Sequence, residues 1–426
     1  METILIGLLL VALALLGAPL FAVLGAVAVL SFAAEGIDPS VVMIDLTRIA
    51  TNPTLLAIPL FTFAGYLLAE SKAPTRLVEL ARSLFGWFPG GLAVVALVTC
   101  ALFTAFTGAS GVTIVALGGL LFPVLIKESY PERLSLGLVT TSGSLGLLFP
   151  PSLPLILYAL ITQISIDRLF AAGMLPGLLL LVMLSVFAVV RVRRLKIPRH
   201  RFEPVRALAA LRAAAWEIPL PPFILIGIYT GLFTATEAAA VTAFYVLVVE
   251  VFIYKDLNLF RDIPRVMRES MLLVGAILMI IGVAMGLTNF LIDQEVPAHL
   301  FAMTQEVIGS TLVFLIVLNI FLLLVGMMMD IFSAIIVVVP LILPIAAAYG
   351  VDSVHLGIIF LANLEIGYLT PPVGLNLFIS SLRFDKSIFG VVRATLPFIG
   401  ILLIALLLIT YLPDLSLWLP NVLGVD

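Results

Sequence analysis

The sequence predicts an all-helical protein that crosses a membrane many times and consists of two halves of inverted orientation. The composition, the spacing of apolar segments and an internal repeat predict this fold. Of the 426 residues, 62% are hydrophobic and 11% are charged, whereas soluble domains are about 45–50% apolar and 25% charged. Apolar segments recur from Ile4 to Leu412 with short polar loops between them. This spacing leaves no sizeable soluble domain for an enzyme or a nucleic-acid-binding module.

A helix needs about 20 apolar residues to cross the hydrocarbon core of a membrane. Two apolar stretches, 90–126 and 311–349, are too long for one span, and each is interrupted by small or polar residues, GASG at 108–111 and GMMMD at 326–330. We expect each stretch to form a re-entrant hairpin whose non-helical tip is buried in protein or lines a wet cavity. The other predicted spans are 3–16, 18–33, 52–71, 134–163, 172–190, 218–233, 235–254, 271–291, 354–382 and 389–412.

The two halves align at a single offset. Pro123, Gly146 and Pro151 each have a residue of the same type 221 positions later. Around them, SGSLGLLFPPS at 142–152 corresponds to NLEIGYLTPPV at 363–373, so that each half has a helix interrupted by glycine and a proline pair. Paired interruptions of this kind indicate the binding site of a transporter.

The repeat divides the chain into scaffold and transport regions. VRALAALRAAAWE, at 205–217, has the pattern of an amphipathic helix at the cytoplasmic interface, and 74–86 and 256–269 have a similar pattern. The predicted regions are first-half scaffold helices at 1–89, a first transport region at 90–163, a scaffold helix with a basic arm at 164–217, second-half scaffold helices at 218–310, a second transport region at 311–382 and a C-terminal scaffold helix at 383–426.

Lysine and arginine collect in cytoplasmic loops, which predicts the orientation. A periplasmic N-terminus places 20 of the 22 lysine and arginine residues inside and leaves only Arg48 and Arg168 outside. The first hairpin then opens to the cytoplasm and the second to the periplasm. Most acids of the outer face lie at 38–48 and 292–306, which are either solvated loops or a docking surface for a periplasmic partner.

The hairpin tips and helix breaks form the predicted site. Unwound backbone together with hydroxyl and amide side chains suits a cation such as Na⁺. Half-helices that begin at Gly111 and Ser152 direct their N-terminal ends toward the first break, which favours an anionic substrate. Alternatively, these small residues only allow close helix packing. The predicted cation ligands are Gly108, Ser110, Ser142, Ser144 and Gly146 in the first half, and Gly326, Asp330, Asn363, Gly367, Thr370 and Gly374 in the second.

Three acids lie within apolar segments, where a charge is costly. Asp330 either coordinates a cation or holds the second tip closed by accepting backbone N–H groups. Glu365 either lines the site or makes a structural hydrogen bond. Glu237 is most simply a cap on the helix that begins at Thr234 or Thr236, and it is also retained as a candidate functional acid. No HExxH, GxSxG or paired transmembrane aspartate motif is present, which argues against an intramembrane enzyme, and no cofactor is expected besides Na⁺ as coupling ion.

Several runs, in their order along the chain, resemble a known family. They are SGSLGLLFPPS at 142–152, IYTGLFTATEAAAVTAFY at 228–245 and TPPVGLNLFISS at 370–381. They look like the large membrane subunit of tripartite ATP-independent periplasmic (TRAP) transporters. The resemblance extends over essentially the whole chain, including IPLFTFAGYLLAES at 58–71 and FAAGMLPGLLL at 170–180.

The resemblance implies a secondary transporter of the bacterial inner membrane that imports an organic acid, such as a C4-dicarboxylate, sialic acid or a similar carboxylate, with Na⁺ by an elevator motion. It implies two partners, a small four-helix membrane subunit and a periplasmic substrate-binding protein. Some relatives have an acid about a turn after the tip serine, where this chain has Thr113 and Ile114, so no acidic role is transferred there. The alternative is a stand-alone Na⁺-coupled divalent-anion symporter of similar architecture. The implied substrate contacts are Ser110, Pro151, Ser152, Thr370 and Asn376.

Overall fold

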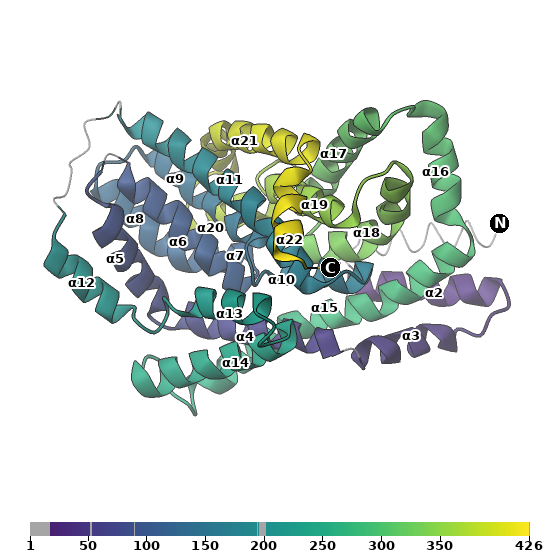
Figure 1. The fold of residues 1–426 in the computed structure, drawn as a ribbon, viewed down its shortest axis with the longest axis horizontal. Coiled ribbons are helices and arrows are strands. Elements are labelled where there is room, and N and C mark those ends of the chain that lie inside the picture. The colour runs from purple at the N-terminus through teal and green to yellow at the C-terminus, as the bar shows by residue number, and fades with distance from the viewer. Residues whose placement is uncertain (1–17, 52, 89, 194, 196–201, 426) are drawn as a thin grey trace.

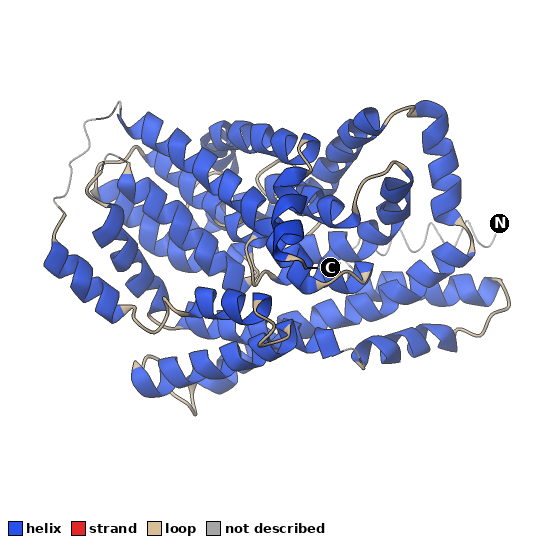
Figure 2. Cartoon of the chain, in the orientation of Figure 1, coloured by secondary structure: helices blue, strands red, loops and turns tan. Residues whose placement is uncertain are grey.

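The computed structural model describes residues 18–51, 53–88, 90–193, 195 and 202–425, and within these ranges it contains helices and no strand (Figures 1 and 2). The predicted span at 3–16 lies outside the described residues. Nine of the described helical segments are long and apolar enough to cross a membrane, so the chain is a multi-pass helical membrane protein. These segments are Pro53–Glu70, Ser110–Lys127, Glu132–Thr162, Ile166–Arg193, Ala235–Ile253, Asp262–Asp293, Thr311–Met328, Ile331–Ala348 and Ile388–Tyr411.

Both long apolar stretches are interrupted where the sequence predicts. The first forms a helix pair, which we call pair 1, and the second forms pair 2. Pair 1 comprises α6 (Gly91–Thr107), α7 (Ser110–Thr113), a π-helical turn (Ile114–Gly118) and α8 (Gly119–Lys127), and pair 2 comprises α17 (Thr311–Met328) and α18 (Ile331–Ala348).

The two predicted broken helices are also interrupted in the structure. Break 1 separates α9 (Glu132–Ser142) from α10 (Leu153–Thr162), with a 3-10 turn at Leu145–Leu148 between them. Break 2 separates α19 (Ser353–Gly367) from α20 (Leu375–Phe384). Each break contains a cis Pro-Pro bond, Pro150–Pro151 and Pro371–Pro372.

The other helices pack in two groups (Figure 1). In the first group, α15 lies along α2, α3 and α4, and α14 packs on α4 and α13. In the second group, α11 packs on α6, α19, α21 and α22, while α21 packs on α9 and α19. The bounds are α2 (Leu20–Ala34), α3 (Ser40–Ala50), α4 (Ala57–Glu70), α11 (Ile166–Arg193), α13 (Leu220–Tyr229), α14 (Ala235–Val248), α15 (Asp262–Asp293), α21 (Ile388–Tyr411) and α22 (Asp414–Leu423).

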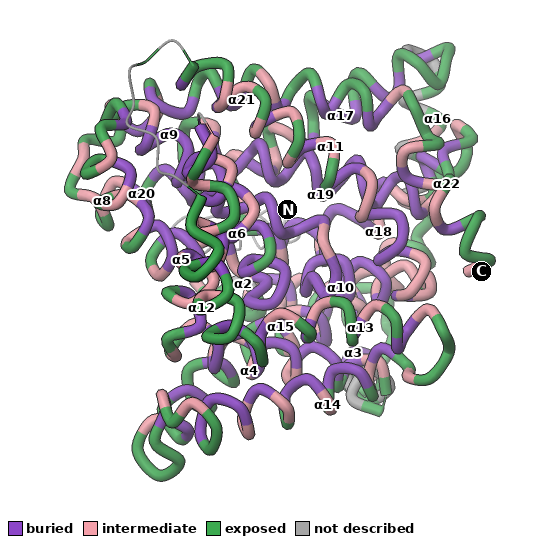
Figure 3. Tube along the Cα trace, turned by 60° about the vertical axis from the view of Figure 1, so that its left-hand side comes forward, coloured by how far each residue is buried: buried purple, intermediate pink, exposed green. Residues whose placement is uncertain are grey.

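Burial separates the centre of the molecule from its edge. Residues of α10 and α19 are almost all buried, whereas α12 (Pro204–Ala213) is exposed along most of its length (Figure 3). In an apolar 18-residue window of Glu132–Thr162, 83% of the residues are buried within the protein, against 33% in such a window of Ile166–Arg193. Break 1 and the helix α19 before break 2 are therefore surrounded by protein rather than by lipid.

Three expectations about the connecting segments are wrong. The predicted loops at 38–48 and 292–306 contain α3 and α16 (Val296–Val307). A separate interfacial helix at 256–269 is not formed, because α15 already begins at Asp262. The stability of α3 comes from packing: Val42 lies against Gly286 of α15, where an added Cβ would be 3.1 Å from Val42 Cγ1. Such a tertiary contact leaves no strong periodic signal in a short segment.

An ion-pair cluster joins the amphipathic helix α5 (Ala73–Phe85) to two segments, one that precedes α13 and one that follows α14. Arg76 pairs with Glu217, Glu250 and Asp256, and its Cζ lies 3.8 Å from the ring centroid of Tyr254. The side chains are well covered, with 12% of Arg76 exposed and 0–6% of the three acids. One arginine of α5 therefore binds both the segment before α13 and the segment after α14.

Replacement of Arg76 by glutamine is expected to destabilise the protein strongly, because it leaves the covered carboxylates of Glu217 and Glu250 without a cation and leaves Asp256 only the exposed Lys72. Removal of one partner from a buried ion pair costs about 3–5 kcal/mol. Thermal unfolding of the purified protein in one detergent measures the effect. Arg206→Gln is the matched control, since Arg206 pairs with Glu79 at 3.2 Å with about half of each side chain exposed, and such a pair contributes about 0–1 kcal/mol. Equal midpoints for the two variants would contradict the assignment.

Candidate substrate and cation site

The tip of pair 1 depends on Gly108. This residue has a left-handed φ of +63° at the end of α6, a conformation that glycine adopts without a steric cost. A Cβ at this position would lie 2.5 Å from Leu153 Cδ1, at the start of α10. The tip therefore lies directly against the helix that follows break 1. Ala109 is extended, and α7 begins at Ser110.

Threonines of pair 1 contact the backbone of break 1. Thr104 Oγ1 donates to the carbonyl oxygen of Gly143 at 2.9 Å and lies 2.7 Å from Thr113 Oγ1. At Gly146, an added Cβ would be 2.3 Å from the carbonyl oxygen of Ala101, so α6 and the 3-10 turn touch through their backbones. Pair 1 thus supplies a partner for a carbonyl that the end of α9 leaves free.

The tip of pair 1 also contacts the second half of the chain. Ser110 Oγ donates to Asn376 Oδ1 in α20 at 2.7 Å, and both side chains are buried. A second polar contact joins α9 to α20, where Thr140 Oγ1 lies 2.9 Å from Ser380 Oγ. Two predicted site residues that are 266 positions apart are therefore in direct contact.

Polar atoms without partners lie on the segments around this contact. Within the described residues, Asn376 Nδ2 and the hydroxyls of Thr107 and Thr141 are buried and have no hydrogen-bond partner. Buried polar groups are normally paired with protein, water or a ligand. Thr107 immediately precedes the first tip, and Thr141 lies in the last turn of α9. These atoms can serve as donors and acceptors for a bound solute.

Pair 2 meets break 2 through glycine backbones. A Cβ on Gly367 would lie 2.5 Å from the carbonyl carbon of Gly326, so α17 and α19 are in backbone contact. The N–H of Gly374 donates to the carbonyl oxygen of Met327 at 3.2 Å. The N–H of Ile331 donates to Tyr368 Oη at 2.6 Å. The second tip is therefore attached to both sides of its break.

Asp330 caps the helix α18. Its Oδ1 accepts the backbone N–H groups of Phe332 and Ser333, both at 3.0 Å, and its Oδ2 accepts the Ser333 hydroxyl. The sequence predicted two alternative roles for Asp330, cation coordination and closure of the second tip through backbone N–H groups. These hydrogen bonds correspond to the second role. The residue is exposed, and coordination by its carboxylate stays a prediction.

Asn363 and Glu365 have different environments on α19. Asn363 Nδ2 donates to Asn319 Oδ1 at 2.7 Å, and Asn319 Nδ2 donates to Thr410 Oγ1 at 3.1 Å. Glu365 is 1% exposed, and neither carboxylate oxygen has a hydrogen-bond partner among the described residues. Of the two alternatives for Glu365, the structural hydrogen bond is not formed among the described residues, and the site-lining role stays a prediction.

The other predicted hydroxyls bond to carbonyls close in sequence. The acceptors are Val139 for Ser142, Thr141 for Ser144, Leu147 for Ser152 and Ile366 for Thr370. Break 1, with Pro151, is buried, whereas 371–373 in break 2 are exposed. Break 2 is therefore accessible from the surface of the protein, whereas break 1 is enclosed.

Glu237 lies away from both breaks and forms a capping box. Its backbone N–H donates to Thr234 Oγ1 at 3.2 Å, and its Oε2 accepts the Thr234 N–H at 2.8 Å. The capping interpretation agrees with the structure. A further role for this exposed acid stays a prediction.

Sequence reasoning missed Thr104, Thr113, Thr140, Asn319 and Ser380. Asn319 could have been found, because a buried amide within an 18-residue apolar helix is expensive unless it has a partner. The threonines and Ser380 carry no such signal. Hydroxyl residues occur in many spans and often bond to a carbonyl of their own helix.

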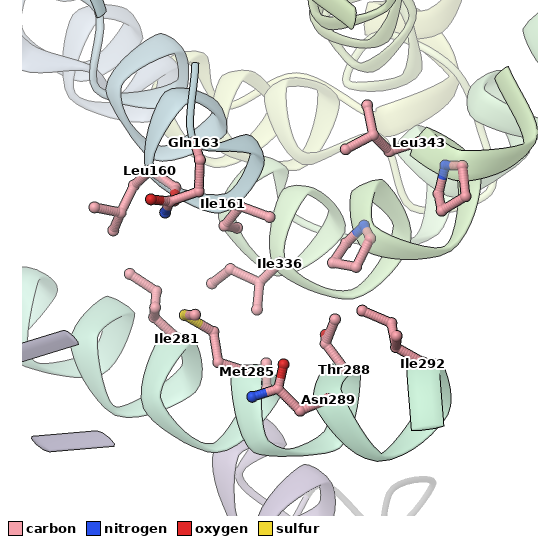
Figure 4. Close-up of a pocket in the computed structure, with 13 residues that line it drawn as sticks. Leu160, Ile161, Gln163, Ile281, Met285, Thr288, Asn289, Ile292, Ile336 and Leu343 are labelled. Atoms are coloured by element: carbon pink, nitrogen blue, oxygen red, sulfur yellow. The ribbon is translucent and has the colours of Figure 1, made fainter. Parts of the chain in front are cut away.

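The structure also contains a cavity of about 570 Å³ between α10, α15 and α18 (Figure 4). Ile336 of α18 faces Met285 of α15 across it, and its polar side chains are Gln163, Thr288 and Asn289. None of the predicted site residues lines it. The cavity lies between α15 of the first helix group and the helices α10 and α18, which belong to break 1 and pair 2.

Comparison with known proteins identifies the family. The family model of the DctM component of tripartite ATP-independent periplasmic transporters matches residues 6–415. The chain belongs to this family. It is therefore the large permease component of a TRAP transporter and not an enzyme.

Relatives and a solved structure agree with this assignment. The C4-dicarboxylate TRAP transporter large permease protein DctM of Pseudomonas aeruginosa is 38% identical over 94% of this chain and 94% of that protein. The isethionate TRAP transporter permease protein DctMQ of Oleidesulfovibrio alaskensis is 33% identical over 94% of this chain and 64% of that protein. The YdaH transporter of Alcanivorax borkumensis has a similar fold, with a TM-score of 0.67, 15% identity, and 95% and 97% of the two chains covered.

Gly367→Ala is expected to lower the stability of the permease, because the new Cβ would overlap the backbone of Gly326. Overpacking of this kind costs about 1–3 kcal/mol. Gly400→Ala in α21 is the control, since a Cβ there meets nothing within 4 Å and alanine favours a helix by about 1 kcal/mol. The unfolding midpoint should fall for the first variant and stay or rise for the second. Unchanged stability of Gly367→Ala would rule out the backbone contact.

Proposed function

We propose that this chain imports an organic acid together with Na⁺ by an elevator motion, as the permease of a three-part system. The observation that carries the proposal is the contact of Ser110 with Asn376, which joins the tip of one half to the broken helix of the other. Unpaired polar atoms lie on the same segments. A carboxylate or sulfonate is the proposed substrate class, since the two TRAP relatives above are named for C4-dicarboxylates and isethionate.

Na⁺ is proposed at both breaks. Helix ends leave carbonyl oxygens without intrahelical partners, and such oxygens can coordinate Na⁺ at membrane depth. The hydroxyl of Thr141, buried and unpaired, adds a possible ligand at break 1. The residues proposed for the first ion are Gly108, Ser110, Ser142, Ser144 and Gly146. Those proposed for the second are Gly326, Asp330, Asn363, Gly367, Thr370 and Gly374.

The proposed motion carries the second helix group past the first. Pairs 1 and 2 are interpreted as opposed re-entrant hairpins of an inverted repeat, with the N-terminus in the periplasm. Since α11 and α21 pack on the pairs and broken helices, we assign both to the moving group, although the sequence placed them with the scaffold. The cavity between α15 and the helices α10 and α18 lies along the proposed sliding boundary.

Two partners are proposed in the inner membrane and periplasm. The family name describes a tripartite system, and one relative is named DctMQ and is longer than this chain. A small four-helix membrane subunit would pack on the first helix group. A periplasmic binding protein would deliver the substrate to the exposed side of break 2.

Transport in proteoliposomes tests the proposal. Liposomes with this chain, the small subunit and the binding protein should take up a labelled C4-dicarboxylate or isethionate only with an inward Na⁺ gradient. Ser110→Ala should lower uptake at least about tenfold with unchanged folded protein, because the contact between the halves is lost. Ser270→Ala is the control, since Ser270 is buried but bonds only within α15. Uptake by the chain alone would support the stand-alone symporter instead.

Glu365 is proposed as a functional acid. A buried carboxylate without a partner costs several kcal/mol, so a cation or a proton must accompany it. Glu365→Gln removes the charge at nearly constant volume and should leave the unfolding midpoint unchanged or raised, while Na⁺-dependent uptake falls at least about tenfold. Uptake with a normal rate and normal Na⁺ dependence would exclude this role.

A further inference from the structure

A cationic groove lies away from the proposed substrate site, where three helices of the second group meet. It consists of two adjoining cavities of about 420 and 520 Å³ that share Arg133. The first lies between the start of α9 and the start of α21, and the second extends to the end of α11. None of the residues proposed for substrate or Na⁺ lines either cavity.

One end of the groove is strongly basic. Its charged lining residues are Arg133, Arg191, Lys386, Arg393 and the single acid Glu132. Glu132 pairs with Lys386. Within the described part of the chain, the three arginines form no ion pair, so their charges are not neutralised by nearby carboxylates. The groove therefore has an uncompensated charge of about +3.

Arg133 is held in place without losing its charge. Its Nε and Nη2 donate to the carbonyl oxygen of Arg393 at 3.2 and 2.9 Å. This neutral acceptor orients the guanidinium between the two cavities. The remaining donors of Arg133, together with Arg191 and Arg393, can bind the oxygens of a phosphate, for which the planar guanidinium is well suited.

The other end of the groove is apolar. It is lined by Phe187 of α11 and by Pro397 and Phe398 of α21. The two phenylalanine rings meet edge to face with their centroids 5.2 Å apart, and Arg191 Cζ lies 5.5 Å from the ring centroid of Phe187. Since α11 and α21 are both candidate spans, this apolar surface continues into the hydrocarbon region, while the arginines lie at the membrane edge.

We propose that this groove binds one anionic glycerophospholipid. The phosphate lies among Arg133, Arg191 and Arg393, and an acyl chain lies along Phe187, Pro397 and Phe398. Basic pockets between membrane helices attract anionic headgroups in this way. Neither free phosphate nor a small organic anion would use the apolar end. The lipid would connect α9, which leads into break 1, with α11 and α21.

Lipid binding to the purified permease tests this proposal. Native mass spectrometry should show one retained phosphatidylglycerol, with a preference of about tenfold or more over phosphatidylcholine of the same chain length. Phosphatidylglycerol should also raise the unfolding midpoint in a saturable manner. The double variant Arg191→Gln/Arg393→Gln should bind about tenfold or more weakly, whereas the control Arg212→Gln/Arg261→Gln, which removes two exposed cations elsewhere, should bind normally.

Each other outcome would overturn the proposal. Equal binding of the two lipids would indicate a merely apolar groove. Equal stabilisation by inorganic phosphate would indicate a small-anion site, and stabilisation by the organic-acid substrate would indicate a second substrate site. Equal losses in both double variants would indicate unspecific attraction to the membrane. If the Arg191/Arg393 variant does not fold, the lipid competition on the unmodified protein still decides.

Discussion

A backbone N–H or carbonyl that leaves a helix inside a membrane must find a partner within the protein. Both broken helices are arranged around this constraint. At break 1 the Gly143 carbonyl accepts the Thr104 hydroxyl of pair 1, and at break 2 the Gly374 N–H donates to the Met327 carbonyl of pair 2. At each break the neighbouring helix pair therefore supplies a partner for one freed backbone group. Interrupted helices can exist here only because the pairs approach them closely.

Close approach in turn depends on glycine. Gly108 lies against Leu153, Gly146 against the backbone of α6, and Gly326 against Gly367. Any side chain at these positions would separate the pair from its break and remove the partners of the freed polar groups. The alternative of close packing and the proposal of a binding site therefore do not exclude each other. The packing holds the unwound backbone in the geometry that a binding site would need.

Charged groups are kept at the edges of this apolar structure. The Arg76 cluster joins connecting segments of the first helix group, and the cationic groove lies at the ends of α9, α11 and α21. In the interior the polar groups are mostly neutral, such as Asn319, Asn363 and Asn376, and Glu365 is the marked exception. This carboxylate lies next to a break and, unlike the acids of the Arg76 cluster, has no hydrogen-bond partner among the described residues.

Most of the long apolar helices and their interruptions could be located from the sequence alone. Apolar length and paired Gly and Pro positions are local properties, so the interruptions of the two apolar stretches, at Gly108–Ala109 and at Met329–Asp330, and both breaks were predicted correctly. The capping of α14 by Glu237 could also be predicted, because a capping box is a four-residue pattern.

Which segments touch could not be predicted and became clear from the three-dimensional fold. The Ser110–Asn376 contact joins residues 266 positions apart, and nothing in the repeat predicts that the first tip lies against the second broken helix. Helix α3, with Val42 against Gly286 of α15, and the pairing of Thr104 with Gly143 were missed for the same reason. Such contacts depend on the free energy of packing between distant segments, which a sequence pattern of a few residues does not encode.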